Sequence, residues 1–357
     1  MFTNIYRRKD GRYEARIALG KGVEGKRIYR SIYGRTTEEV EMKLAAICSR
    51  NYTITEITVK EITNEYLASL KPQIKESTLA NYRMKAEKHI IPAFGTEKCC
   101  DITACMVTEF INNKIQRGLS ARYVADIFVL FKSIFRYAAR AHNIRNPLDG
   151  LKAPKCTKAE VAVLSKENQT RLLKIAASSS DMRSLGVVIA MYTGMRIGEI
   201  CALKWGDIDL DSKTIHVRYT LQRIQTFDNS KKTKIVITEP KSASSVRDIP
   251  IPKCLLHLLE KHRKDDDMFV LSGSCKPVEC RSVQYHFANL LKNGNLPSVH
   301  FHSLRHAFAT NCIALGFDVK TLSEILGHSR VEITLNRYVH SSIERKRACM
   351  SLLKWVA

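Results

Sequence analysis

The amino-acid sequence predicts a multidomain protein that is mainly α-helical with small β-sheets. Apolar residues recur at three- and four-residue spacing through most of the chain, and in two shorter regions they alternate with polar residues. The length of 357 residues, 45% of them hydrophobic, exceeds one ordinary core and suffices for several. We therefore predict four segments: residues 1–52, a three-stranded sheet plus a helix; 53–153, a helical domain; 154–163, a linker; and 164–357, a mixed α/β domain with a C-terminal tail.

The first 52 residues predict a basic sheet backed by one helix. Tyr13 and Ala15 alternate with charged residues in GRYEARIAL, as in a half-buried strand, and KRIYRSIY repeats the pattern. Thr36 and Glu39 have the spacing of a capping box, which predicts a helix from there to about Arg50. Ten of the first 35 residues are Lys or Arg and three are acidic, so we expect arginines on the open face of the sheet. A merely solvated charged face explains this composition equally well.

Residues 53–153 have the pattern of a compact helical domain. Apolar residues at helical spacing fill TVKEITNEYLASL, STLANYRMKAEKHII, MVTEFINNKIQRG and SARYVADIFVLFKSIFRYAARAH. Ser77 and Ser120 are the expected caps of the second and fourth of these helices. The lysine-containing segment LKAPKCTKAEVAV carries Pro154, which is typical of an extended linker that crosses a charged partner.

The spacing of apolar residues changes twice in the last segment. It opens with helices, and TIHVRYTL, KIVITE and SVRDIPIP then have the composition of three strands, with Asp209 and Asp211 marking a turn before the first. After Pro252 the helical pattern returns and lasts to the end. This order predicts the mixed α/β domain.

The charge of the chain indicates a polyanionic partner. Lys and Arg number 58 against 35 Asp and Glu, a formal net charge of +23. A field of this sign attracts nucleic acid and makes DNA affinity fall steeply with salt. A membrane surface is the rival polyanion, but the sequence has no apolar run of about 18 residues, no signal peptide and no basic amphipathic terminal helix. We therefore expect a cytoplasmic protein with no membrane partner.

The eleven cysteines favour reduced thiols over disulfides or a metal centre. Their number is odd, they form no CxxC pair, and neither Cys99 with Cys100 nor Cys275 with Cys280 has a spacing that suits zinc. We expect most of these thiols to be buried, and we expect no metal site.

Six side chains in the second half of the chain are candidates for chemistry. Each has an ordinary explanation when taken singly: Arg196 could pair with Glu199 in the first turn of its helix, and Lys241 could be a solvated turn lysine. Three of the polar residues in HFHSLRHAFAT lie at i, i+3 and i+4 and therefore share one helical face. The six candidates are Arg196, Lys241, His302, Arg305, His328 and Tyr338.

Taken together, these side chains suit phosphoryl transfer. The set contains no carboxylate pair or thiolate to bind a metal. Negative charge spreads over the non-bridging oxygens in this reaction, and arginine forks match that geometry with two parallel bonds, so Arg196 and Arg305 would be the clamp. Hydrogen bonds from His302 and His328 would strengthen as the charge develops.

Tyr338 is the candidate nucleophile of the set. A phenol with an ordinary pKa of about 10 attacks poorly unless a base takes its proton and cations favour the phenolate. His302 is the candidate base. The departing 5′ oxygen needs a proton, which Lys241 on a mobile turn can supply.

At this point the sequence resembles the tyrosine recombinases, particularly phage and conjugative-transposon integrases. The motifs TGMRIGE, EPKSASSVRDIPIP, HSLRHAFAT, LGHS and RYVH match the family in chain order, over residues 164–345. The stretch from STLANYRMKAEKHIIPAFG through NPLDGL resembles the core-site DNA-binding domain of the family. The basic N-terminal sheet and helix resemble its arm-site DNA-binding domain.

The resemblance implies a reaction and its partners. Tyr338 would form a 3′-phosphotyrosine and release a 5′-hydroxyl, with no ATP, metal ion or other cofactor. The motif leaves open which of the histidines acts as the base. A homotetramer on double-stranded DNA would exchange strands through a Holliday junction, and an excisionase and a host DNA-bending protein are possible partners. The tail, with Ile343, Leu352, Leu353 and Val356 as a partial apolar stripe, would dock on a neighbouring protomer or pack on its own domain. The candidate DNA contacts are Arg12, Arg16, Arg30, Lys152 and Lys155.

Three other functions compete with this interpretation. A catalytically silent DNA-binding regulator would need a gap in the catalytic set, and the sequence has none. A relaxing topoisomerase of related mechanism does not explain two DNA-binding regions ahead of the catalytic part. A chromosome-dimer resolvase of the same family would lack the basic N-terminal sheet.

Overall fold

The structure of the protein is a computed structural model, and it describes residues 5–21, 27–48, 56–156, 164–226, 232–240, 242–338, 347 and 350–351. Side chains are described for these residues except 17–21, 27–28, 30, 44–48 and 336–338. The chain forms two compact units, residues 1–158 and residues 159–357. The finer division of the first unit at residue 52 stays a prediction, and the apolar stripe predicted for the tail lies outside the described residues.

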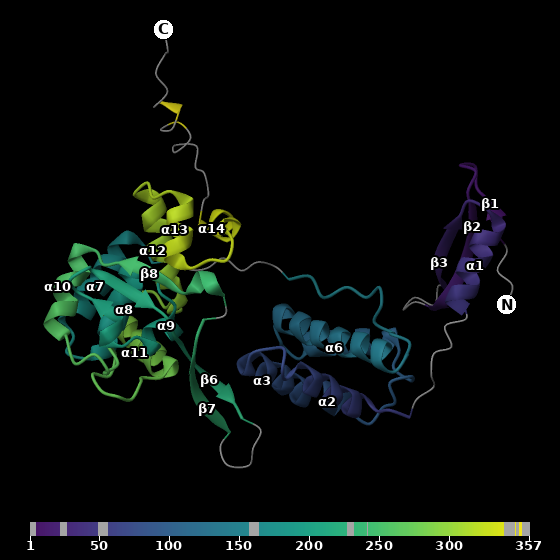
Figure 1. Ribbon diagram of the computed structural model, residues 1–357, viewed down its shortest axis with the longest axis horizontal. Helices are drawn as coiled ribbons and strands as arrows, with labels where there is room; N and C mark the ends of the chain where they lie inside the picture. The colour runs from purple at the N-terminus through teal and green to yellow at the C-terminus, as the bar shows by residue number, and fades with distance from the viewer. Residues whose placement is uncertain are drawn as a thin grey trace, which may run out of the picture. The chain divides into compact units, whose positions relative to one another are not determined.

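The chain begins with a small antiparallel sheet, as predicted. Strands β1 (Tyr6–Arg7), β2 (Tyr13–Lys21) and β3 (Arg27–Gly34) pair in that order, and α1 (Thr37–Cys48) packs along β2 and β3 (Figure 1). Ala15 and Val40 are buried between sheet and helix. The Thr36 hydroxyl accepts from the backbone N–H of Glu39 at 3.2 Å, while the Glu39 carboxylate accepts from the backbone N–H of Arg35 at 2.7 Å.

A bundle of helices follows. They are α2 (Val59–Leu70), α3 (Glu76–Lys85), a π-helical turn (Ala86–Ile90), α4 (Ile91–Phe94), α5 (Ala104–Gln116) and α6 (Ala121–Ala141). Phe131 lies at their centre, stacked on Phe94 and edge-on to Phe135.

One of the two predicted helix caps is wrong. Ser120 does cap α6, since its hydroxyl accepts from the backbone N–H of Tyr123 at 3.3 Å. Ser77, however, lies inside the first turn of α3. The turn after α2 already brings Lys75 to the extended conformation that precedes a helix, so α3 starts two residues earlier and without a side-chain cap.

The second unit is built around the buried helix α8. Helices α7 (Lys166–Ser178), α8 (Met182–Thr193) and α9 (Ile197–Ala202) precede the strands. Helices α10 (Lys253–His262), α11 (Cys280–Asn293), α12 (His302–Ala314), α13 (Val319–Leu326) and α14 (Val331–Tyr338) follow them. Helices α7, α9, α10, α11 and α12 contact α8, which is buried along most of its length.

The described strands of this unit form two separate sheets. One has the order β4 (Ile208–Asp209), β5 (Thr214–Val217), β8 (Arg247–Pro250), and the other is the hairpin of β6 (Thr220–Gln225) and β7 (Thr233–Thr238). Figure 1 shows this hairpin extending away from the helices of the unit.

The single strand predicted for TIHVRYTL is therefore wrong, because the chain breaks after Val217 into β5 and β6. Ile215, Val217 and Leu221 are all buried and all fall at odd positions, so the two-residue pattern continues across the break. Tyr219 also stands at an odd position but is exposed, and it marks the break between the two strands.

The described cysteines are free thiols, but most are not buried. Cys99, Cys201 and Cys312 are buried, whereas Cys100, Cys105, Cys156, Cys254 and Cys275 are exposed. The exposed ones lie in turns, in irregular segments or in the first turn of a helix, where the apolar periodicity that marks core positions does not apply.

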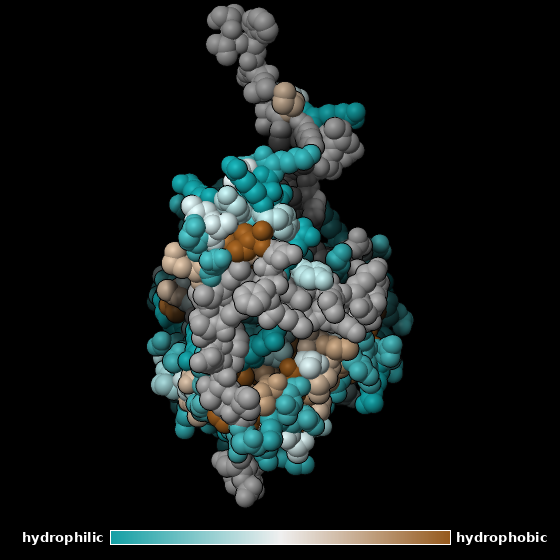
Figure 2. Space-filling model, turned by 90° about the vertical axis from the view of Figure 1, so that its right-hand side faces the viewer, coloured by the Kyte–Doolittle hydropathy of each residue, from teal (hydrophilic) through white to brown (hydrophobic). Residues whose placement is uncertain are grey.

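One face of the protein is largely polar where its residues are described. On the face drawn in Figure 2, hydrophilic residues cover most of the coloured area, with only small hydrophobic patches between them. None of the helices in the described part of the chain is long and apolar enough to cross a membrane.

Candidate active site

Arg196 is held at the junction between α8 and α9. Helix α8 ends at Gly194, which has a left-handed backbone (φ 65°) and where a Cβ would lie 2.5 Å from the Phe308 ring. The chain then re-enters a helix with Arg196 as the N-cap. The Glu199 carboxylate accepts from the Arg196 backbone N–H at 2.9 Å and from its Nη1 at 2.8 Å. The Arg196 side chain keeps 36% of its surface exposed.

Arg305 projects from the first turn of α12 toward the same junction. Its Nη1 donates to the carbonyl of Gly194 at 2.7 Å and its Nη2 to the carbonyl of Leu326 at 2.6 Å. Because Gly194 stands two residues before Arg196, this contact brings the two arginines together. Arg305 is only 2% exposed and is therefore the more buried of the two arginines.

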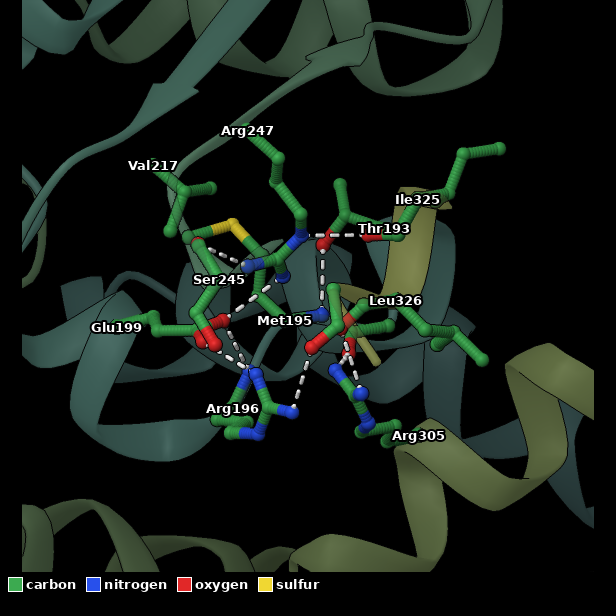
Figure 3. A network of polar contacts seen from close by, with 12 residues as sticks. Thr193, Met195, Arg196, Glu199, Val217, Ser245, Arg247, Arg305, Ile325 and Leu326 are labelled. Atoms are coloured by element: carbon green, nitrogen blue, oxygen red, sulfur yellow. Dashed lines mark hydrogen bonds and ion pairs between the residues drawn. The ribbon is translucent and has the colours of Figure 1, made fainter. Parts of the chain in front are cut away.

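The carboxyl end of α13 accepts hydrogen bonds from three arginines. Arg247 Nε donates to Ile325 O at 2.5 Å and Arg196 Nη2 donates to Gly327 O at 3.1 Å, on either side of the Leu326 carbonyl that binds Arg305. The last carbonyls of a helix carry partial negative charge and lack partners within the helix, so guanidinium groups stabilise them. Figure 3 shows the arginines converging on this end of α13.

Glu199 lies between two of these arginines. In Figure 3 its carboxylate stands between the guanidinium groups of Arg196 and Arg247, and Arg247 Nη2 donates to Oε2 at 2.8 Å. Burial acts to raise the pKa of Glu199, but the charges and hydrogen bonds of Arg247 and Arg196 outweigh it and leave the pKa below its ordinary value. The carboxylate is therefore ionised at neutral pH and orients both cations.

The two candidate histidines stand close in the chain to residues of this network. His328 follows Gly327 directly, and its Nδ1 is 2.8 Å from the hydroxyl of the buried Thr334 on α14, a contact that fixes the ring. His302 is the exposed first residue of α12, and its ring meets that of the buried His306 edge-on, with centroids 4.8 Å apart.

Comparison with known proteins places this arrangement in a family. Residues 162–345 match the model of the "Phage integrase family", and residues 58–115 match "Phage integrase, N-terminal SAM-like domain". The chain belongs to the phage integrase family. The resemblance to tyrosine recombinases inferred from the five motifs is thus confirmed, and the integrase is a tyrosine-type site-specific recombinase.

Individual relatives cover nearly the whole integrase. A tyrosine recombinase XerC-like protein of Caldanaerobacter subterraneus subsp. tengcongensis is 25% identical, with 98% of each chain covered. The Tn1549 transposon integrase in complex with a circular intermediate DNA has a similar fold, with a TM-score of 0.70 and 23% identity over 84% of this chain and 100% of that one. A lambda integrase tetramer bound to a Holliday junction aligns with a TM-score of 0.59 and 21% identity over 95% and 97% of the two chains.

Two of the six predicted catalytic side chains fall outside what the structure describes. Tyr338 ends α14, a helix that packs against α12 and α13, but its side chain is not among those described. Lys241 itself lies outside the described residues. It stands between β7 and β8 as predicted, although these strands belong to different sheets.

The predicted DNA contacts of the integrase lie on two parts of the first unit. Arg12 and Arg16 are exposed on the N-terminal sheet, and Lys152 and Lys155 are exposed in the irregular segment after α6. The side chain of Arg30 lies outside those described.

Arg247 was not among the side chains predicted from the sequence. In β8, buried and exposed residues alternate, and Arg247 takes a buried position in phase with Ile249. A charged residue in the apolar phase of a short strand was the available signal, because burying a guanidinium requires partners.

Proposed function

We propose that this integrase cuts and rejoins DNA through a 3′-phosphotyrosine formed by Tyr338, and so integrates and excises a mobile element. The proposal rests on one observation. Arg196 and Arg305 donate to the carbonyls of Gly327 and Leu326, at the carboxyl end of α13 and directly before His328. This arrangement gathers cationic and hydrogen-bonding groups from segments that are up to 131 residues apart in sequence. Such a cluster matches the charge that develops on a phosphoryl group under attack.

In the proposed step, the Tyr338 phenol attacks phosphorus in line with the 5′ oxygen. The bond from tyrosine to phosphorus forms as the bond to the 5′ oxygen breaks, and the phenolic proton passes to His302. Arg196 and Arg305 bind the non-bridging oxygens, with Arg196 the more accessible of the two. His328, oriented by Thr334, adds a hydrogen bond. A partner strand's 5′-hydroxyl then reverses the chemistry, so no external energy source is needed.

Lys241 is proposed to protonate the departing 5′ oxygen. We expect Lys241→Ala to cleave an ordinary core site slowly and to regain speed on a substrate with sulfur at the 5′-bridging position, since a thiolate leaves without a proton. Single-turnover cleavage of the two substrates measures this difference. Lys232→Ala, directly before β7, is the matched control, and its cleavage rate should fall no more on one substrate than on the other. A Lys241→Ala variant that stays equally slow on sulfur would remove the assignment.

Recombination requires several copies of the chain on DNA. We propose a homotetramer that binds core-type sites through the first unit's helices and the second unit, in the cytoplasm of a bacterium. An excisionase and a host DNA-bending protein are proposed to bias the reaction toward excision or integration.

The N-terminal sheet is proposed to bind separate arm-type sites. Its open face, opposite α1, carries Arg12 and Arg16, which lie over the rings of Tyr33 and Tyr6 at 5.5 and 5.7 Å. Glu14 lies beneath them and is 1% exposed. Hydrogen bonds from Ser31, Arg16, Tyr6 and Arg8 lower its pKa to about 2. These contacts hold the arginine forks in place before DNA arrives, which suits recognition of phosphates and base edges.

We therefore expect deletion of residues 1–50 to spare core-site cleavage and to impair integration. The full-length variant Arg12→Ala/Arg16→Ala should show the same split, because it removes the contacts and keeps the sheet. Adduct formation on a core-site oligonucleotide and integration yield between two plasmids measure the two activities. An unchanged integration yield in both variants would rule out arm binding.

One experiment tests the reaction and locates its substrate. The protein is incubated with labelled DNA from the flanks of its own gene, and the covalent adduct is mapped to the nucleotide. We expect one protein-linked 3′ end in each strand of a short core site. Specific binding without any adduct would instead identify a silent regulator.

A further inference from the structure

We propose that Arg247 is a positioning residue for DNA cleavage, which aims the phosphate-binding Arg196 without touching the phosphate itself. This inference rests on the proposed function of Arg196. It concerns a residue for which the sequence suggested only a place in a strand.

The contacts of Arg247 keep it away from the substrate. Its side chain is 6% exposed, and each of the three guanidinium nitrogens donates within the protein. Nη1 donates to Ser245 O at 3.0 Å, Nη2 to Glu199 Oε2 at 2.8 Å and Nε to Ile325 O at 2.5 Å. Being both buried and ion-paired with Glu199, Arg247 is poorly placed to bind a phosphate.

Arg247 reaches Arg196 through one carboxylate. Glu199 is 3% exposed and presents Oε2 to Arg247 and Oε1 to Nη1 of Arg196. Without Arg247, the glutamate would have a single cationic partner and greater freedom to rotate. The guanidinium of Arg196 would then lose the fixed carboxylate that sets its orientation.

A second contact ties the same arginine to the end of α13. Ile325 O, which accepts from Arg247 Nε, lies two residues before Gly327, whose carbonyl accepts from Arg196. Gly327 has a left-handed backbone, and a Cβ there would lie 3.1 Å from Arg247 Cδ. The helix end and Arg247 therefore pack closely, and Arg196 is held from both sides by groups that Arg247 fixes.

Stability alone does not explain this buried ion pair. Removing two charges from water costs several kcal/mol, and an apolar pair of similar volume often serves stability as well or better. Orientation gives the pair a function, because a small displacement of a group that binds the transition state slows a reaction markedly.

The test uses the full-length protein and the mapped core site in two forms. One has the normal scissile phosphodiester and the other a neutral methylphosphonate, which lacks the charge that Arg196 binds. We expect Arg247→Met to cleave the phosphodiester about 100-fold more slowly, with unchanged DNA affinity, because a misplaced binding group costs about that much. On the methylphosphonate the loss should shrink to a few-fold, as it should for Arg196→Ala.

Two further variants separate positioning from folding. Arg183→Met removes another arginine–carboxylate pair of the same unit, in which Nη2 donates to Asp181 at 2.6 Å. Any loss of cleavage rate in this variant should be equally large on the methylphosphonate and on the phosphodiester. Arg247→Lys keeps the charge but cannot reach Glu199 and Ile325 O together, so it should resemble Arg247→Met in milder form even if the methionine variant folds poorly.

The outcomes are distinct. Wild-type speed in Arg247→Lys, or a loss of equal size on both substrates, would overturn the positioning role. Failure of the wild-type protein to form any adduct would overturn the proposed function, and this inference with it. If the wild-type protein forms the adduct and the Arg247 variants lose less rate on the methylphosphonate than on the phosphodiester, the proposed function and the positioning role are both supported.

Discussion

Replacing Tyr338 by phenylalanine is expected to abolish covalent attachment to DNA completely while sequence-specific binding survives. The substitution removes one oxygen, the atom that would form the bond to phosphorus, and keeps the aromatic ring. Gel-shift titration measures binding, and denaturing gels of labelled core DNA measure the adduct. Binding should keep its steep fall with salt, since the net charge of +23 is unchanged.

The matched control for this variant is Tyr285→Phe on α11. Tyr285 is 69% exposed and belongs to the same unit, so its loss tests for a general effect of removing a surface phenol. It should form adducts at the wild-type rate. Protein that remains linked to nicked DNA in the Tyr338→Phe variant would mean that another residue is the nucleophile.

The order of the helices and strands could be predicted from the sequence, but the residues at which some of them begin and end could not. Helix α6 was predictable because its apolar stripe, its cap Ser120 and its length all agree. The start of α3 was not, because the turn after α2 selects Lys75 over the better capping residue Ser77. The break between β5 and β6 was hidden because both strands keep the same alternation of buried and exposed residues.

The candidate site divides in a similar way. Arg196 and Arg305 could be chosen from chemistry and chain order, and the structure brings them together on neighbouring carbonyls. The contact of Arg196 with Glu199, its ordinary explanation, is present as well. The two roles are compatible, because the glutamate aims the arginine. What no local pattern could reveal is the pairing of Glu199 with Arg247, since the two are 48 residues apart in sequence.

Arg305→Met is the second substitution expected to have a large effect, and it should harm both stability and cleavage. Methionine fills a similar volume but donates nothing, so the carbonyls of Gly194 and Leu326 lose a charged partner in a buried place. An unsatisfied buried polar group costs about 1–3 kcal/mol. Removing one donor from a transition-state site costs about 100- to 1,000-fold in rate. Thermal unfolding and single-turnover adduct formation measure the two effects separately.

The matched control is Arg263→Met, because Arg263 also donates to a backbone carbonyl, that of Trp205, at the end of α10. It should lower the melting temperature by less, because Arg263 is partly exposed, and it should cleave at the wild-type rate once folded. If folded Arg305→Met cleaved as fast as Arg263→Met, Arg305 would serve only to join α12 to the end of α13. The rate lost beyond that control therefore measures what the buried guanidinium contributes to the scissile phosphate, as distinct from what it contributes to the fold.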